Sequence, residues 1–180
     1  SMALLLSAEA EHPGRFTVFM AHGDLGNKIL VRNDSPITSV EQLSEAKIGT
    51  FPGTTMLTYT NISLAPYFNQ SNFPTVIGMQ PPSLVEALTS GQVDASYAVE
   101  RIVSVAIQKV GAREIMDNPL GNIMSPVTGG ASVLSKKFVD EHPEESAAII
   151  RAMNKAVDFI RNNDSESRTS LAKYTGFESE

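Results

Sequence analysis

The sequence predicts an α/β fold in which a mainly parallel sheet is flanked by helices. Short apolar runs typical of strands alternate along the chain with stretches that carry helix-capping and helix-ending residues. Parallel neighbours need a crossover connection, and a helix between consecutive strands supplies one. With 180 residues, 42% of them hydrophobic, the chain is large enough to bury a core as one domain with appendages.

The central feature of the sequence is the segment 47–55, which reads KIGTFPGTT. Its apolar run stops at Pro52 and Gly53 and is followed by Thr54 and Thr55, which can cap a helix. The first N–H groups of a helix have no intrahelical partner, so this strand-turn-helix junction is suited to a small anionic or polar ligand. The simpler interpretation is that Gly53 only lets the chain turn and the threonines only cap.

The expected strands are short apolar segments bounded by turn residues. They are residues 3–6, 16–20, 28–32, 48–51, 75–79, 93–99, 112–117 and 129–134. A helical turn is expected within 37–46, capped by Ser39 with Gln42 three residues later. The helix after Thr55 should be weak or kinked, because it contains poor helix formers and Pro66 falls in its span. Its mostly apolar face is predicted to consist of Leu57, Asn61, Leu64, Ala65 and Phe68.

Four further helices are predicted. Ser83 and Glu86 match a capping box, and Gly91 is placed to end that helix. The next helix covers 100–110 and stops at Gly111. A long amphipathic helix covers 143–162, with Pro143 at its first position, and a shorter one runs from 164 or 165 to about 174.

In parallel sheets of this kind, ligands bind beyond the carboxyl ends of the strands. Three turns follow such ends, at 51–55, 80–83 and 99–101, and each leads into a helix. Together these turns could line one pocket.

The composition of the chain limits the kinds of partner and chemistry that it can have. A formal net charge of -6, with no run of Lys or Arg, argues against binding to nucleic acid or to an anionic membrane surface. With no cysteine in the chain, disulfides, thiolate metal sites and cysteine nucleophiles are excluded. His12, His22 and His142 lack metal-ligand spacing, and there is neither a G-x-S-x-G motif nor a P-loop. We therefore predict no enzymatic activity, no catalytic residue, no metal and no cofactor.

Five segments in order resemble the solute-binding proteins of ABC importers, type II periplasmic binding proteins of the branch for nitrate, sulfonates, taurine and thiamine precursors. These segments are SAEAEHPGRF (7–16), DSPI (34–37), KIGTFPGTT (47–55), EALTSGQVDA (86–95) and HPEE (142–145). The resemblance implies two α/β lobes joined by crossing strands, a small solute in the cleft, and delivery to an ABC permease in the periplasm or another extracytoplasmic space.

On this resemblance the chain divides into three parts. Residues 1–36 are the crossing strands with a remnant of the first lobe, 37–127 form the second lobe, and 128–180 are the return strand and C-terminal helices of the first lobe. Family members usually begin with several dozen residues of first lobe that this sequence does not contain. One wall of the cleft must then come from elsewhere, and a homodimer or other homo-oligomer that exchanges segments is expected.

The predicted ligand site combines the three turns. Backbone N–H and hydroxyl groups of Gly53, Thr54 and Thr55 should hold a polar head, with Ser83 at the second turn, although capping alone would explain Ser83. Arg101 could pair with a sulfonate or carboxylate through its planar guanidinium, or it is simply a solvated arginine. The remaining candidates for the pocket wall are Tyr97, Glu100 and Thr128.

Two alternatives remain open at this level. The chain could be a truncated, oligomerising domain of the same fold with no transport role. It could also be an effector-sensing domain of the LysR kind, which normally follows a DNA-binding helix-turn-helix that is absent here.

Overall fold

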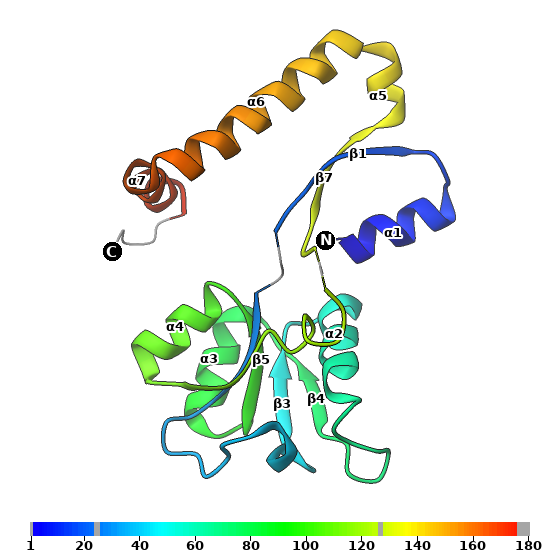
Figure 1. The fold of residues 1–180 in the computed structure, drawn as a ribbon. Coiled ribbons are helices and arrows are strands. Elements are labelled where there is room, and N and C mark those ends of the chain that lie inside the picture. Colours follow the sequence, from blue (N-terminus) through cyan, green and yellow to red (C-terminus); the bar gives the residue numbers. More distant parts are fainter. Residues whose placement is uncertain (1, 24–25, 126–127, 176–180) are drawn as a thin grey trace. The chain divides into compact units, whose positions relative to one another are not determined.

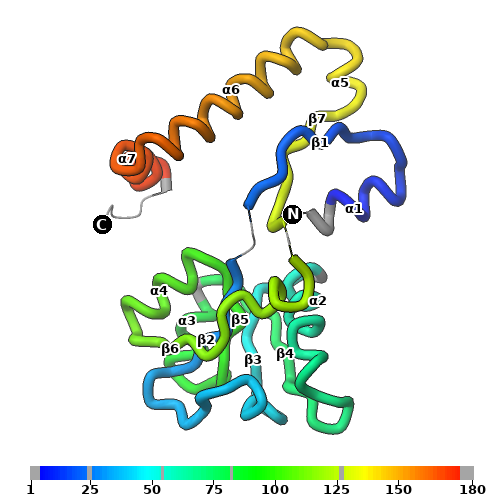
Figure 2. The backbone as a smooth tube through the Cα atoms, viewed as in Figure 1, coloured from blue at the N-terminus to red at the C-terminus, as the bar shows by residue number. Residues whose placement is uncertain are grey.

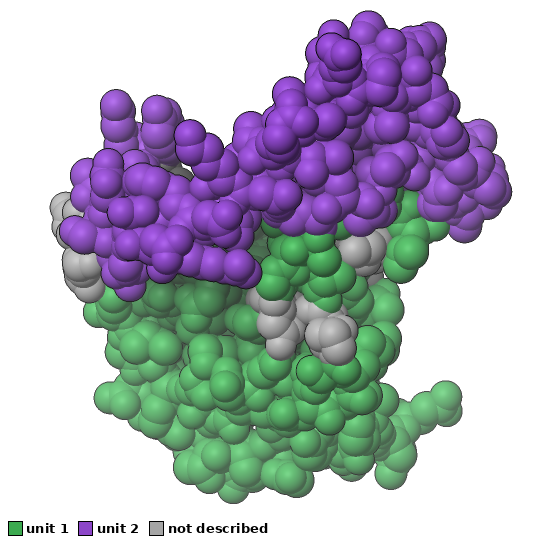
Figure 3. Space-filling model, turned by 45° about the horizontal axis from the view of Figure 1, so that its top comes forward, with its two compact units in different colours: residues 1–7, 21–131 green, residues 8–20, 132–180 purple. Residues whose placement is uncertain are grey.

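The computed structural model describes residues 2–23, 26–125 and 128–175. The chain divides into two compact units (Figure 3). Unit 1 consists of residues 1–7 and 21–131, and unit 2 of residues 8–20 and 132–180. Each unit is described by itself below.

Unit 1 is built on a five-stranded sheet with the order β4-β3-β5-β2-β6 (Figures 1 and 2). Its strands are β2 (Asn27–Val31), β3 (Lys47–Thr50), β4 (Thr75–Gly78), β5 (Ala95–Val99) and β6 (Arg113–Asp117). β3 pairs in parallel with both β4 and β5, whereas β2 runs antiparallel to β5 and to β6. Four strands therefore point the same way, as a mainly parallel sheet requires, with β2 reversed among them.

Two apolar clusters cover the two faces of this sheet, because successive side chains of a strand point to opposite sides. Ile29, Val31, Ile48 and Tyr97 belong to one cluster together with Leu64 of α2. The other cluster consists of residues from β2, β5 and their neighbours together with α3 and α4: Leu30, Leu84, Ala87, Leu88, Val93, Ala98, Val103, Ala106 and Ala112. Helix α2 therefore covers one face, and α3 and α4 cover the other.

The helices of unit 1 connect these strands. They are the 3-10 turn η1 (Val40–Leu43), α2 (Thr54–Leu64), α3 (Pro81–Ser90) and α4 (Ile102–Val110). Ser39 is the N-cap of η1, and the Gln42 side chain accepts a hydrogen bond from the Ser39 amide at 3.3 Å, as predicted. α3 and α4 end at Gly91 and Gly111, both in the left-handed conformation that glycine favours.

Unit 2 is mainly helical. It contains α5 (Lys136–Glu141), α6 (Pro143–Asn162) and α7 (Asp164–Thr175). β1 (Phe16–Ala21) pairs with β7 (Ala131–Ser135) in a separate two-stranded sheet. The bounds of α6 are those predicted, with Pro143 in its first turn and Glu144 and Glu145 beside it. α5 was not predicted; the Ser135 hydroxyl caps it by accepting a hydrogen bond from the Phe138 amide at 3.1 Å.

Three predictions about elements are wrong. Residues 3–6 belong to a helix, α1 (Met2–Glu11), because the sequence MALLLSAEAE has no β-branched residue and is rich in strong helix formers. α3 begins at Pro81 with Gln80 as N-cap, so Ser83 lies within its first turn and is not the cap. Proline lacks the N–H that would be unpaired there in any case, and its fixed φ suits the first helical positions.

The third correction concerns α2. Its buried residues are Thr60, Ser63 and Leu64, while Asn61 of the predicted apolar face is exposed. α2 stops at Leu64, so Pro66 lies beyond its end and does not kink it. None of the helices in the described ranges combines the length and apolarity needed to cross a membrane.

Candidate functional site

The turns that follow β3, β4 and β5 lie at one edge of the sheet of unit 1. These three strands are parallel neighbours, so their carboxyl ends meet at the same edge. The turns at 51–53, 79–80 and 100–101 each lead into a helix, as predicted. The first turn also packs against the end of β4: the Cα of Pro52 would lie 3.2 Å from a Cβ placed on Gly78.

β3 and β5 form a topological switch point. The chain leaves β3 for α2 on one face of the sheet and leaves β5 for α4 on the other face. Adjacent loops that diverge in this way leave a crevice outside the carboxyl ends of the strands, where ligands bind in open α/β sheets. Main-chain pairing between the two strands runs from Ile48–Ala95 to Gly49–Ser96. It therefore stops one residue before the end of β3 at Thr50.

The first turn of α2 faces this edge with unpaired donors. Gly53 is the N-cap, with φ 103 and ψ 157, a conformation that side chains rarely adopt. As a glycine, the N-cap has no side chain with which to cap the helix, and a Cβ on Gly53 would meet nothing within 4 Å. The amides of Thr54, Thr55 and Met56 are the helix's first three donors and have no intrahelical acceptor. The Thr55 side chain is half-buried, and the Thr54 side chain lies outside the described part.

The second turn contributes less than its position implies. Ser83 is exposed in the first turn of α3. Pro81 and Pro82 before it have no N–H, and the Leu84 amide donates to Gln80 O at 3.0 Å. Ser83 is therefore the one backbone donor that the first turn of α3 can offer to a ligand.

Glu100 and Arg101 lie at the third turn. Arg101 is the N-cap of α4 with φ 81 and is exposed, so α4 begins two residues later than predicted. The Glu100 carboxylate accepts a hydrogen bond from the Ser104 hydroxyl at 3.0 Å and from the Arg101 amide at 3.3 Å. Glu100 thus caps the positive end of α4, and its negative charge would oppose an anion at this turn.

Tyr97 and Thr128 differ from the pocket-wall prediction. Tyr97 is 0% exposed and sits in the core, with its hydroxyl 3.2 Å from the Ser63 hydroxyl, and burial raises its pKa to about 12. β5 is a central strand whose two faces are both covered, so its side chains are buried whichever face they point to. Tyr97 therefore lies in the core and not on an open pocket wall. The Thr128 hydroxyl shares its one proton between the carbonyl oxygens of His22 and Gly130, so it joins two backbone segments.

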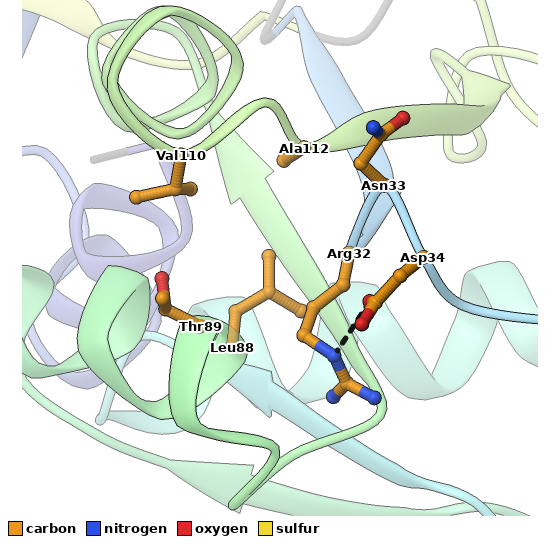
Figure 4. Close-up of a pocket in the computed structure, with 7 residues that line it drawn as sticks. All are labelled: Arg32, Asn33, Asp34, Leu88, Thr89, Val110 and Ala112. Carbon is orange, nitrogen blue, oxygen red and sulfur yellow. Dashed lines mark hydrogen bonds and ion pairs between the residues drawn. The ribbon is translucent and has the colours of Figure 1, made fainter.

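A separate pocket of about 240 Å³ lies at the opposite edge of the sheet, where β2 ends (Figure 4). In it Arg32 Nε lies 3.2 Å from Asp34 Oδ1. The pocket is lined by Arg32, Asn33, Asp34, Leu88, Thr89, Val110 and Ala112. None of the predicted site residues is among these, so this pocket is distinct from the candidate site.

Within the described ranges, no three residues of the His, Cys, Asp or Glu type gather as metal ligands would. The charged cluster near the candidate edge is an ion-pair group. Lys28 Nζ lies 2.8 Å from Glu114 Oε2 and 2.5 Å from Asp117 Oδ1. The hydrogen bonds that the Lys28 ammonium donates to these carboxylates, to Asp117 first and then to Glu114, raise the pKa of Lys28.

The doubly wound sheet, with helix starts converging at one edge, defines a lobe of the type II periplasmic-binding-protein class. The chain belongs to the NMT1/THI5-like family, whose model matches residues 23–167. A Bacillus subtilis (strain 168) protein that bears the provisional name of an aliphatic sulfonates-binding protein is 30% identical over 131 residues, which are 73% of this chain and 39% of that protein.

Solved structures agree with this fold. The periplasmic aliphatic sulphonate binding protein SsuA from Escherichia coli aligns with a TM-score of 0.76 and 18% identity, over 96% of this chain and 55% of SsuA. The desulfurization enzyme DSZB aligns with a TM-score of 0.73 and 18% identity, over 98% of this chain and 65% of DSZB. The chain thus spans less than two thirds of the length of these relatives, and the fold is shared by binding proteins and an enzyme.

Proposed function

We propose that this chain binds a small anionic organic solute, with a sulfonate as the favoured head group, at the switch-point edge of unit 1. The observation that carries the proposal is the first turn of α2, whose three leading amides have no intrahelical acceptor and lie at the switch point of β3 and β5. A sulfonate has three acceptor oxygens and one negative charge, so it can satisfy several of these donors at once. Each such contact contributes about 0.3–1 kcal/mol.

The sulfonate class is favoured over other anions by the relatives. A curated relative and several structural neighbours bear names that refer to sulfonate binding. We further propose that the chain acts without chemistry, as part of an extracytoplasmic solute-binding component that delivers its solute to an ABC permease. In this proposal residues 37–127 are the second lobe, while 1–36 and 128–180 are the crossings and the first-lobe part.

The ligand role is tested by isothermal titration calorimetry with ethanesulfonate, taurine and nitrate, and with ethylammonium as the opposite-charge control. We expect ethanesulfonate to bind and ethylammonium not to bind. Absence of binding of ethanesulfonate, taurine and nitrate to the folded protein would contradict the proposal. Recovery of unaltered ethanesulfonate after long incubation, measured by NMR, tests the absence of chemistry.

The location of the site is tested by Thr54→Pro. Proline is tolerated at the first helical position, and Gly53 before it has the extended ψ of 157 that a following proline requires. The variant therefore removes one amide donor while keeping the helix. We expect ethanesulfonate affinity to fall about two- to fivefold. An unchanged affinity would place the anion elsewhere.

A homodimer is the second candidate, favoured by the surface of unit 2. Among its described residues only Ser146 is buried, and α6 and α7 expose large apolar side chains: Ile149, Phe159, Ile160, Leu171 and Tyr174. Faces of this kind are usually covered. We propose that a second copy of the chain covers the apolar face of α6 and α7, so that the protein functions as a homodimer.

Size-exclusion chromatography with light scattering tests the dimer. We expect a dimer mass for the unaltered chain and a monomer for Ile160→Asp, which places a charge on the exposed apolar face. Arg161→Asp, at the next position of the same helix, is the matched control and should remain dimeric. A monomer at all concentrations of the unaltered chain would contradict the dimer and leave the ligand proposal untouched.

A further inference from the structure

A layer of hydroxyl groups lies between α2 and the sheet, just inside the turn at 51–53. Thr50, Thr60 and Tyr97 are 0% exposed, and Ser63 is 1% exposed. Threonine and serine are poor helix formers, yet α2 buries one of each where a helix on a sheet usually places apolar side chains. Their hydroxyl groups must therefore find partners inside the protein.

Thr60 joins the two elements that the turn separates. Its Oγ1 lies 2.8 Å from the Met56 carbonyl oxygen and 3.3 Å from Thr50 Oγ1. Met56 belongs to the first turn of α2, and Thr50 is the last residue of β3. A hydroxyl has one proton, so Thr60 shares it between these two acceptors. We call Thr50, Met56 and Thr60 the hydroxyl clasp.

The clasp is also fixed to β5. The Thr50 hydroxyl donates to the Tyr97 carbonyl oxygen at 3.1 Å. Its own proton is then used, so its oxygen is available to accept from Thr60. This side-chain bond follows directly after the main-chain pairing of Gly49 with Ser96, and it therefore holds β3 to β5 at the carboxyl end of β3.

The hydroxyl clasp affects the position of the first turn of α2. A threonine hydroxyl that bonds back to the carbonyl four residues earlier can bend a helix slightly, and the carbonyl that Thr60 contacts belongs to Met56, in the first turn of α2. The start of α2 is held by the packing of Met56 against the core and of Pro52 against Gly78. The contact between Thr60 and Thr50 adds a direct link from the helix to the end of β3.

We propose that Thr60 is a positioning residue, which through Thr50 and Met56 fixes the direction in which the amides of Thr54, Thr55 and Met56 point. The inference rests on the proposed function, because these amides are the donors assigned there to the sulfonate. Thr50 and Thr60 are both 0% exposed, so in this proposal they do not touch the solute themselves.

The chain offers a matched control in the same layer. Ser63 Oγ lies 3.2 Å from the Tyr97 hydroxyl, so this pair also ties α2 to β5 through buried hydroxyls. It holds the end of the helix, however, two turns away from Thr54. Loss of this pair should cost comparable stability without moving the first turn.

The experiment compares Thr60→Val and Thr50→Val with Ser63→Ala. Valine keeps the β-branched shape and removes the hydroxyl. Residual dipolar couplings from NMR report N–H directions, and we expect the Thr54, Thr55 and Met56 couplings to change in both valine variants but not in Ser63→Ala. If only one valine variant folds, that one decides, and Thr60→Ser, which keeps the hydroxyl, should restore the original couplings.

Calorimetry with ethanesulfonate supplies the second readout. We expect about fivefold weaker binding in Thr60→Val and unchanged binding in Ser63→Ala. Equal ethanesulfonate affinities for Thr60→Val and Ser63→Ala would overturn the positioning role of Thr60. Couplings that change alike in the valine variants and in Ser63→Ala would do the same. If ethanesulfonate does not bind the unaltered protein, the proposed function fails, and the couplings alone still decide whether Thr60 positions the turn.

Discussion

Pro52 packs against Gly78: the Cα of Pro52 would lie 3.2 Å from a Cβ on Gly78. This contact joins the turn after β3 to the end of β4, and an alanine would have to displace it by a few tenths of an ångström. Pro52 is exposed and lies in a turn, so the turn can move without unfolding the sheet. For Gly78→Ala we therefore expect little change in the free energy of unfolding.

Ligand binding should respond more strongly to Gly78→Ala. A displaced Pro52 shifts Gly53 and the first amides of α2, and we expect ethanesulfonate affinity to fall by about 1 kcal/mol, or roughly fivefold, in calorimetry. Gly23→Ala is the control, because a Cβ there would meet nothing within 4 Å. If both variants bind alike, the contact between Pro52 and Gly78 has no part in the site.

Gly53→Ala tests the backbone of the turn directly. The added Cβ would meet no neighbour within 4 Å, yet φ is +103, so the cost comes from conformation alone. We expect the free energy of unfolding in urea to fall by about 1–3 kcal/mol. A variant as stable as the original would show that the turn adopts another conformation at no cost.

The alternation of elements was predictable because its signals are local. Pro143 with two following glutamates marks the start of α6. Gly91 and Gly111 end α3 and α4, and the apolar runs that separate the predicted helices are too short to be helices themselves. The parallel core follows from this alternation. The reversed position of β2 does not, because its pairing with β5 and β6 joins residues far apart in the sequence.

The candidate site was predictable only in part. That Gly53 and Ser83 lie at one edge follows from β-α-β order. The inward orientation of Tyr97 depends on which face each strand residue takes, and a shift of one residue reverses it. Thr60 is a poor helix former in the sequence, but its partners Thr50 and Met56 become visible only when α2 is packed on the sheet.

Tyr97 should make stability fall at alkaline pH. Burial raises its pKa from 10.0 to about 12, partly offset by the hydrogen bond with Ser63. The unfolded chain loses this proton first, so the contribution is complete below about pH 10, declines through about pH 12 and is absent above it. We expect a slope of about 1.4 kcal/mol per pH unit in that window.

Urea unfolding between pH 9 and pH 12 measures this slope, with Tyr97→Phe as the comparison. The phenylalanine variant should start less stable, since Ser63 loses its partner, and should lose less stability as pH rises. Parallel curves for the two proteins would mean that Tyr97 ionises as readily in the folded as in the unfolded state.

Lys28 should stabilise unit 1 through its two carboxylate partners. Its ammonium lies between Glu114 and Asp117 of β6, and its side chain is only 20% exposed. Lys28→Met leaves two like charges facing one another, and we expect a loss of about 1 kcal/mol at pH 7 in urea unfolding. The loss should shrink in high salt, which screens the charges. Lys109→Met, at an exposed position of α4, should have little effect at low or high salt. An equal loss for Lys28→Met at low and high salt would assign its effect to packing of the lysine stem and not to charge.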